Sequence, residues 1–140
     1  GLQNREAALR ICPVVGLGGK PRAQQFNLEF RPMDATASPH LAMAAVLIAG
    51  RLGIEQELPL SAVTDVDPHS LSAEQREELG IKALPASLEE AQRLLLEDSE
   101  LCAQLPAALL DTYVSMKRQE LVLTRELGEE QLCEAYATYY

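Results

Sequence analysis

Two short segments near the start of the chain carry the alternation of apolar and polar positions that is typical of β-strands. In residues 26–31 the alternation runs without a break, as on a half-buried strand, and its polar positions hold Asn27, Glu29 and Arg31. Residues 9–12 are a second, shorter candidate, and the glycine-rich residues 14–25 are long enough to connect the two. We therefore expect a short antiparallel strand pair.

After Pro32 the pattern changes to that of helices. Ser38 is placed to be an N-cap and Pro39 to occupy the first helical position before residues 41–50. This stretch is apolar on every side, which predicts a helix that is buried all round. His40, at the start of this helix, is expected to be a core or helix-end residue rather than a metal ligand, because no second ligand follows at helical spacing.

The rest of the chain indicates further helices separated by turn signals. Ser72 is followed three residues later by Gln75, and Ser87 by Glu90, which is the spacing of a capping box. The two short helices that begin at these serines are expected to end near Gly80 and Asp98. A long helix should run from Pro106 to about residue 127, and a last one over residues 129–139, while residues 58–70 form a surface loop. The expected fold class is α+β, with a short antiparallel strand pair followed by about five helices.

Composition favours one compact domain. The 140 residues are 47% apolar and 24% charged, and a chain of this size should bury roughly two-thirds of the surface of its unfolded form. The longest apolar stretch is about half of the roughly 20 residues that cross a bilayer, so we expect a soluble protein with no membrane partner. The three cysteines, Cys12, Cys102 and Cys133, form no CxxC pair and should pack as small apolar residues, which favours a cytoplasmic location.

The charge is divided unevenly along the chain. The net charge is −9, which makes nucleic acid an unsuitable partner for the whole chain. Up to Arg31, however, five basic residues stand against two acidic ones, a net charge of +3, and the remainder carries −12. A small cationic region on an acidic protein suits a compact anionic ligand such as a phosphate or a carboxylate.

Three charged residues of the strand pair could carry chemistry. Glu29 and Arg31 lie two apart, so on a strand they project to the same side, about 7 Å apart. A carboxylate can bind Mg²⁺, and a guanidinium can bind a carboxylate or phosphate with two hydrogen bonds. Arg10 points away from its apolar neighbours and could face the same cleft. A solvated strand face, with Arg10 as a plain surface arginine, is the alternative interpretation.

Other motifs are excluded by their residues. The glycines before Lys20 do not form a phosphate-binding loop, because Val14 stands where the first glycine is required and Pro21 where Ser or Thr should bind magnesium. His69, like His40, lacks a second metal ligand at helical spacing. No nucleophile stands beside a histidine in a known motif, so a covalent mechanism has no support.

Residues 4–11 and residues 28–41, which include the run Phe30-Arg31-Pro32-Met33-Asp34, resemble the C-terminal signature of the catalytic domain of the glutamine synthetase family. The alanine-rich residues 42–54 and the segments 71–80 and 84–91 are similar to the helices that follow this signature. The resemblance implies that residues 1–140 are the C-terminal portion of such a domain, with strands and an active-site segment in residues 1–37 and a helical region in residues 38–140.

The family resemblance also implies substrates and roles. The expected reaction activates glutamate with ATP and transfers it to ammonia or a small amine, with Mg²⁺ or Mn²⁺ bound, in a ring-shaped homo-oligomer. Glu29 matches a metal-binding carboxylate and Arg31 the arginine that holds glutamate. Arg5 matches an arginine near the phosphates and the substrate, with a catalytic role, and Arg10 matches one that contacts ATP. The isolated fragment is expected to be inactive, since one carboxylate does not hold a pair of metal ions.

Some positions depart from the family pattern. Asn27 stands where the family commonly has an arginine that neutralises ATP phosphates, and Ser38 and His40 replace the usual Asn and Tyr. Three alternatives therefore stay open: a γ-glutamyl ligase for another amine, a non-catalytic relative comparable to the lens protein lengsin, and a free-standing acidic helical interaction module in residues 72–140.

Overall fold

The computed structural model describes residues 1–16, 18–60 and 63–139. The chain divides into two compact units, each made of two segments. Unit 1 comprises Gly1–Ala35 and Pro59–Ala83, and unit 2 comprises Thr36–Leu58 and Leu84–Tyr140. Residues 59–83 thus belong with the N-terminal strands, although no hydrophobic pattern in the sequence indicates this grouping.

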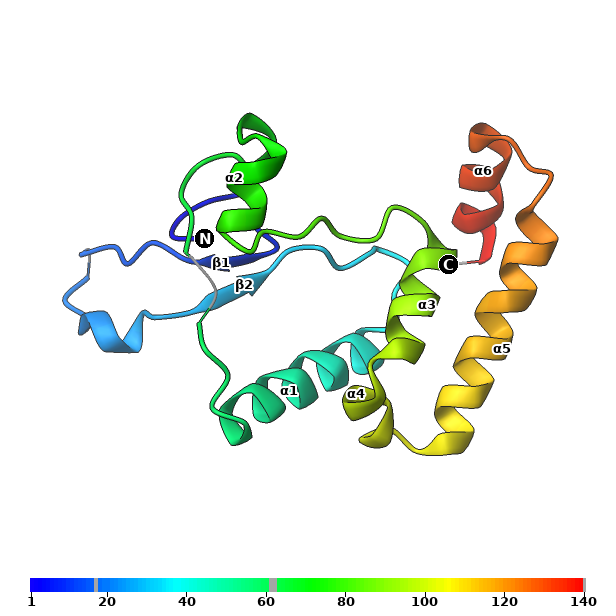
Figure 1. Cartoon of the computed structure of the whole chain (residues 1–140), viewed down its shortest axis with the longest axis horizontal. Coiled ribbons are helices and arrows are strands. Elements are labelled where there is room, and N and C mark those ends of the chain that lie inside the picture. Colours follow the sequence, from blue (N-terminus) through cyan, green and yellow to red (C-terminus); the bar gives the residue numbers. More distant parts are fainter. Residues whose placement is uncertain (17, 61–62, 140) are drawn as a thin grey trace. The chain divides into compact units, whose positions relative to one another are not determined.

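Unit 1 is built on the predicted strand pair. Strands β1 (Leu9–Ile11) and β2 (Leu28–Phe30) are antiparallel, with Arg10 opposite Glu29 (Figure 1). Both strands are shorter than the alternating pattern predicts. The connection between them contains a short 3₁₀-helix, η1 (Arg22–Gln24), rather than being irregular throughout.

A buried asparagine fixes the loop that precedes β1. The side chain of Asn4 donates from Nδ2 to the carbonyl oxygens of Thr64 (3.3 Å) and Val66 (3.0 Å). Its Oδ1 accepts from the backbone N–H of Glu6 at 2.9 Å. Because a buried amide is stable only when its donors and acceptor are paired, Asn4 ties the first loop of the chain to the segment that contains Thr64 and Val66.

The remaining helices of unit 1 are 3₁₀-helix η2 (Pro68–Ser70) and α2 (Ala73–Glu78). The predicted capping box of α2 is confirmed: the hydroxyl of Ser72 accepts from the N–H of Gln75 at 3.2 Å, and Oε1 of Gln75 accepts from the N–H of Ser72 at 2.8 Å. Gly80, with φ 64°, ends the helix in the left-handed conformation that glycine tolerates.

Unit 2 is entirely helical in the part of it that the structure describes. Its helices are α1 (Pro39–Glu55), α3 (Leu88–Glu97), α4 (Ser99–Ala103), α5 (Ala107–Thr124) and α6 (Glu129–Tyr139). With the strand pair of unit 1, they confirm the α+β class.

Two helix starts in unit 2 differ from the sequence prediction. The sequence patterns do not predict the short α4; its N-cap is Asp98, whose carboxylate accepts from the N–H of Leu101 at 2.9 Å. At the start of α3, Ser87 caps the N–H of Glu90 as predicted, but the carboxylate of Glu90 accepts from the N–H of Ala86 instead of Ser87. The predicted capping box of α3 is therefore only half formed.

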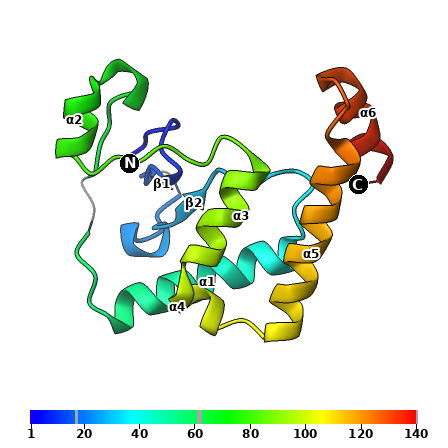
Figure 2. The same ribbon diagram turned by 45° about the vertical axis from the view of Figure 1, so that its right-hand side comes forward.

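Helices α3 and α5 pack side by side (Figures 1 and 2). Val114 of α5 is the one apolar side chain among the described residues that is buried, with 6% of its surface exposed. Helix α6 is attached to α5 by a polar contact, in which the Tyr136 hydroxyl donates to the carboxylate of Glu120. Lys117 forms an ion pair with the same carboxylate at 2.7 Å.

The prediction that α1 is buried all round is wrong. No residue of α1 is buried, and Leu47 and Ile54 expose 69% and 80% of their surface. Within unit 2, α1 packs against α4, which has five residues and is too short to cover a helix of 17. His40 is likewise exposed at the helix start.

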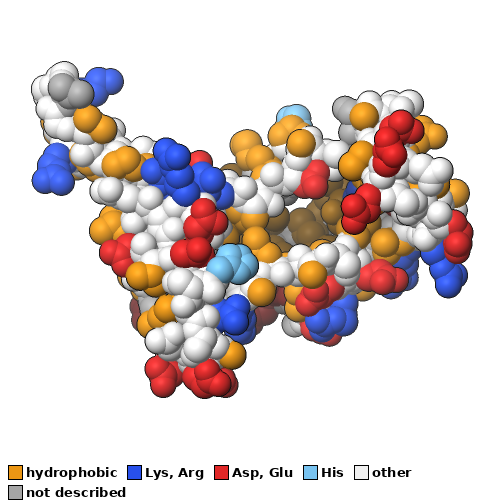
Figure 3. All heavy atoms as spheres, turned by 90° about the horizontal axis from the view of Figure 1, so that it is seen from above, with side chains coloured by type: hydrophobic (Ala, Val, Ile, Leu, Met, Phe, Trp, Pro, Cys, Tyr) orange, Lys and Arg blue, Asp and Glu red, His pale blue; other side chains and the backbone are white. Residues whose placement is uncertain are grey.

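The chain as a whole buries less surface than its length predicts. It exposes 11116 Å², whereas a folded monomer of this mass exposes about 7,000 Å². Many hydrophobic side chains lie open on the face shown in Figure 3. Within unit 2, the exposed apolar side chains include Leu47, Val122 and Leu123. Among the described residues, no helix has both the length and the apolar character to cross a bilayer.

Candidate active site

The strand register brings three of the predicted site residues together. Arg10 of β1 lies opposite Glu29 of β2, and Arg31 follows β2 directly, so the three side chains share one face of the strand pair. Nη1 of Arg10 donates to Oε2 of Glu29 at 3.0 Å, and Nη1 of Arg31 donates to Oε1 at 2.7 Å. We refer to Arg10, Glu29 and Arg31 as the Glu29 cluster.

Burial differs among the members of the Glu29 cluster. The side chain of Arg10 is 15% exposed, whereas those of Arg31 and Glu29 are 34% and 40% exposed. Arg10 is therefore not a plain surface arginine, and its Nε is buried without a hydrogen-bond partner among the described residues. Because an unpaired buried donor is unfavourable, Arg10 is a candidate for contact with an anionic ligand.

The electrostatics of the Glu29 cluster keep the carboxylate ionised. The hydrogen bond from Arg10 is the largest cause that lowers the pKa of Glu29 below its ordinary value of 4.5. Desolvation, the second largest, opposes it, and the charges of Arg31 and Arg10 lower the pKa further. At neutral pH the cluster therefore holds one full negative and two full positive charges. The net positive charge agrees with the cationic character of the first 31 residues.

Cys12 is a neighbour of the site that sequence reasoning did not place there. Its Sγ lies 3.8 Å from Oε2 of Glu29, and its side chain is half-buried, as is that of Cys102. In hindsight the pattern could have shown this, because Cys12 is two residues beyond Arg10 on the same strand face. Cys133, by contrast, is exposed, so the expectation that all three cysteines pack as apolar residues is wrong for it.

Arg5 does not join the Glu29 cluster. Its side chain is exposed and forms no ion pair or hydrogen bond with the described residues. The loop that carries it is nevertheless fixed, because the neighbouring Asn4 is buried and makes three hydrogen bonds. Arg5 is thus held on an anchored loop with its guanidinium free to bind a ligand.

Asn27 is engaged locally. The side-chain Nδ2 of Asn27 donates to the carbonyl oxygen of Gln25 at 3.0 Å. The backbone carbonyl oxygen of Asn27 accepts from the N–H of Cys12 at 3.1 Å. The amide thus shapes the start of β2. It adds no charge to the face of the strand pair, unlike an arginine at this position.

The described residues do not make a complete magnesium site by themselves. No three His, Cys, Asp or Glu side chains gather in the described parts of the chain in a way that could hold a metal ion. Glu29 is the one carboxylate of its cluster, and both of its oxygens accept hydrogen bonds from guanidinium groups. Mg²⁺ prefers six oxygen ligands, so other ligands would have to come from outside this chain.

Residues 1–136 match the family described as "Glutamine synthetase, catalytic domain", and the chain belongs to this family. It is 33% identical over its whole length to the "Gamma-glutamylpolyamine synthetase GlnA3" of Streptomyces coelicolor, of which it covers 29%. It is 36% identical over 137 residues, 96% of its length, to the glutamine synthetase of Aquifex aeolicus, of which it covers 28%.

A solved structure has the same fold. The protein described as "Crystal structure of novel glutamine synthase homolog" superposes with a TM-score of 0.81 at 59% sequence identity, over 99% of this chain and 28% of that one. The chain therefore spans less than a third of the length of these relatives. The family named from the sequence motifs is confirmed.

Proposed function

We propose that this chain is the C-terminal part of the catalytic domain of an ATP-dependent ligase that makes glutamine from glutamate and ammonia. The observation that carries this proposal is the Glu29 cluster, in which one carboxylate lies between two guanidinium groups on a strand pair. Membership of the glutamine synthetase family supports it. Because strands hold side chains more rigidly than loops do, the cluster can present fixed charges to the reactants.

The reaction has two steps. An oxygen of the γ-carboxylate of glutamate attacks the γ-phosphorus of ATP, and the bond to the bridging oxygen breaks to release ADP. Ammonia then attacks the acyl carbon of γ-glutamyl phosphate, loses a proton, and inorganic phosphate leaves. Phosphoryl transfer depends mainly on positioning and on neutralising charge, which is work that fixed arginines can do.

Each predicted residue has a role in this proposal. Arg31, the more exposed arginine of the cluster, binds the carboxylate of glutamate, and the more buried Arg10 contacts ATP. Arg5, with its free guanidinium, binds phosphate oxygens and the substrate during transfer. Glu29 supplies one ligand to a divalent metal, Mg²⁺ or Mn²⁺, which would neutralise phosphate charge when bound.

We also propose that the isolated chain is inactive. Glu29 alone cannot complete the metal site, and the open face of the strand pair needs walls from other parts of a longer protein. The full enzyme would be a homo-oligomeric ring. Three cysteines without a disulfide among them support a reducing, cytoplasmic setting.

The test is γ-glutamyl hydroxamate formation by the full-length protein, with hydroxylamine in place of ammonia. We expect Glu29→Ala to lower the rate by at least about 100-fold, as for the loss of a group that stabilises developing charge. Glu55→Ala is the matched control, because Glu55 also forms an ion pair with an arginine, Arg51 at 3.0 Å, but on the exposed surface of α1. Equal rates for Glu29→Ala and the wild type would remove Glu29 from the mechanism.

A second candidate function is γ-glutamyl transfer to an amine other than ammonia. It is favoured by the relative named as a γ-glutamylpolyamine synthetase, whose match covers the whole chain. Supplying putrescine instead of ammonia and measuring ADP release separates the two functions. Faster release with putrescine would favour the amine ligase. If neither acceptor stimulates ADP release, a non-catalytic relative is indicated, consistent with the uncharged Asn27.

A further inference from the structure

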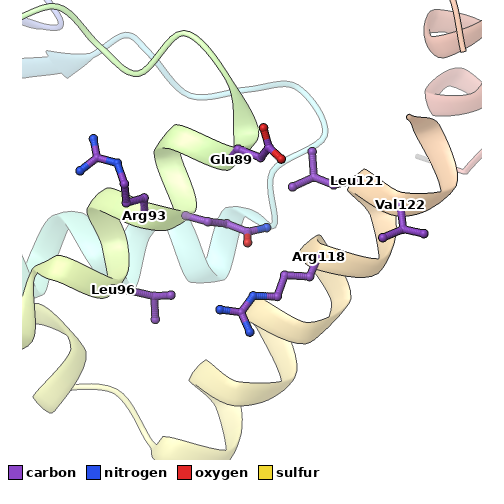
Figure 4. Close-up of a pocket in the computed structure, with 7 residues that line it drawn as sticks. Glu89, Arg93, Leu96, Arg118, Leu121 and Val122 are labelled. Atoms are coloured by element: carbon purple, nitrogen blue, oxygen red, sulfur yellow. The ribbon is translucent and has the colours of Figure 1, made fainter. Parts of the chain in front are cut away.

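A groove with its own polar groups lies between α3 and α5, away from the Glu29 cluster in the sequence and within unit 2 alone (Figure 4). Its volume is about 470 Å³, within the range of small-molecule sites. The residues that line this α3–α5 groove are Glu89, Gln92, Arg93, Leu96, Arg118, Leu121 and Val122.

The helical period explains how the groove is built. Glu89, Gln92 and Leu96 are three and four residues apart, so they lie along one face of α3. Arg118 and Leu121 are three apart on α5, with Val122 beside them. Each helix therefore contributes both polar and apolar side chains to the groove.

Gln92 is a buried amide without partners. It is 7% exposed, and its Nε2 has no hydrogen-bond partner among the described residues. Leaving a buried donor unpaired is unfavourable, and native proteins rarely do so. Since the two ends of an amide exchange by rotation about its last bond, Gln92 can present a donor to a ligand in the groove.

The charges of the groove are also incompletely paired. Arg93 is neutralised by Glu97, one turn further along α3, at 2.7 Å. Glu89 and Arg118, in contrast, form no ion pair among the described residues. They come from opposite helices, with Arg118 directed toward the side of Leu96, and Glu89 at the end near Leu121 (Figure 4). The groove thus holds one free charge of each sign.

We propose that the α3–α5 groove binds a free amino acid with an aliphatic side chain. Arg118 and the amide of Gln92 bind its carboxylate, Glu89 binds its ammonium group, and Leu96, Leu121 and Val122 contact the side chain. A purely acidic ligand would be repelled by Glu89, and a purely basic one by Arg118, so charge complementarity favours a zwitterion. This site is independent of the proposed ligase reaction and is tested by binding alone.

The experiment is calorimetric titration of the full-length protein with L-leucine as the probe. We expect one leucine to bind per chain. Leucinamide, which lacks the carboxylate, and 4-methylpentanoate, which lacks the ammonium group, should each bind at least about 10-fold more weakly, the effect of losing one charge-assisted hydrogen bond. These comparisons use the wild-type chain, so they do not depend on whether a variant folds.

Variants then locate the site. Arg118→Gln and Glu89→Gln should each weaken leucine binding at least about 10-fold, whereas the control Arg125→Gln, at the exposed end of α5, should leave it unchanged. Circular dichroism confirms that the helices are retained. The proposal is overturned if leucine does not bind at about 10 mM or if leucinamide binds as tightly as leucine. It is also overturned if Arg118→Gln dissociates the oligomer of the full-length protein in sedimentation, which would make the groove an interface between copies.

Discussion

The sequence predicts the arrangement of side chains on the strand pair of unit 1 better than it predicts the burial of helix α1 in unit 2. On the strand pair, Glu29 and Arg31 lie on one side as predicted, and Arg10, whose direction the pattern left open, lies opposite Glu29 and binds it. The apolar α1 forms as predicted but remains exposed, with Ile54 80% open. Period and register are local properties, whereas burial depends on which other surfaces cover an element.

The first test of this contrast is at Val114, the one apolar position that is buried among the described residues. Val114→Ala should lower the free energy of unfolding of unit 2 by about 2 kcal/mol, because it removes buried methyl groups and leaves a cavity. Val122→Ala on the same helix is the matched control, since Val122 is 67% exposed, and should cost about 0.5 kcal/mol or less. Thermal unfolding followed by helix ellipticity measures both. Equal effects would show that unit 2 has no core around Val114.

Much of the fold could be predicted because its signals lie within a few residues of one another. Ser72 and Gln75 specify the start of α2, and Pro39 the start of α1. The five-residue α4 was missed because Asp98, which caps its start, also stands at the end of α3. From the sequence, Asp98 indicates only the end of a helix. The grouping of residues 59–83 with the strands depends on the long-range bonds of Asn4 to Thr64 and Val66, and no periodicity reports these.

The candidate site was predictable in part for the same reason. Strand alternation placed Glu29 and Arg31 on one side, and the apolar neighbours of Arg10 indicated its direction. Their assignment to metal, substrate and nucleotide came from family resemblance alone. Cys12 was missed although the strand alternation could have placed it, because it lies two residues beyond Arg10. Gln92 was missed because the significance of a glutamine depends on which groups surround it.

Each unit has a helix capped by a serine, so the stabilising effect of a cap can be compared between the two units. Ser72→Ala and Ser87→Ala should each cost about 1 kcal/mol, since each serine hydroxyl accepts from a backbone N–H in the first helical turn. Hydrogen exchange at the amides of Gln75 and Glu90, respectively, should accelerate. Ser99→Ala is the control, because Asp98 rather than Ser99 caps α4. Unchanged exchange in both variants would mean that these caps do not stabilise their helices.

The smallest expected effect is the pH dependence of the Glu29 cluster. Since the pKa of Glu29 in the folded chain is lowered, its contribution to stability is fully present above the ordinary value of 4.5 and is lost as pH falls through the lowered pKa. Glu74, whose pKa is lowered mainly by the Ser72 hydroxyl, acts in the same direction. A carboxyl-carbon NMR titration resolves the two residues. A midpoint for Glu29 at or above 4.5 would contradict the ion pairs with Arg10 and Arg31.

The most direct test of the central claim, that the strand pair binds the reactants, compares substrate affinities in the full-length enzyme. Arg31→Gln should raise the KM for glutamate about 10- to 100-fold with little change for ATP, and Arg10→Gln should raise the KM for ATP by a similar factor, because each loses a charge-assisted hydrogen bond to its ligand. If neither substitution changes either KM while the enzyme remains active, the Glu29 cluster is a structural ion pair and not a binding site.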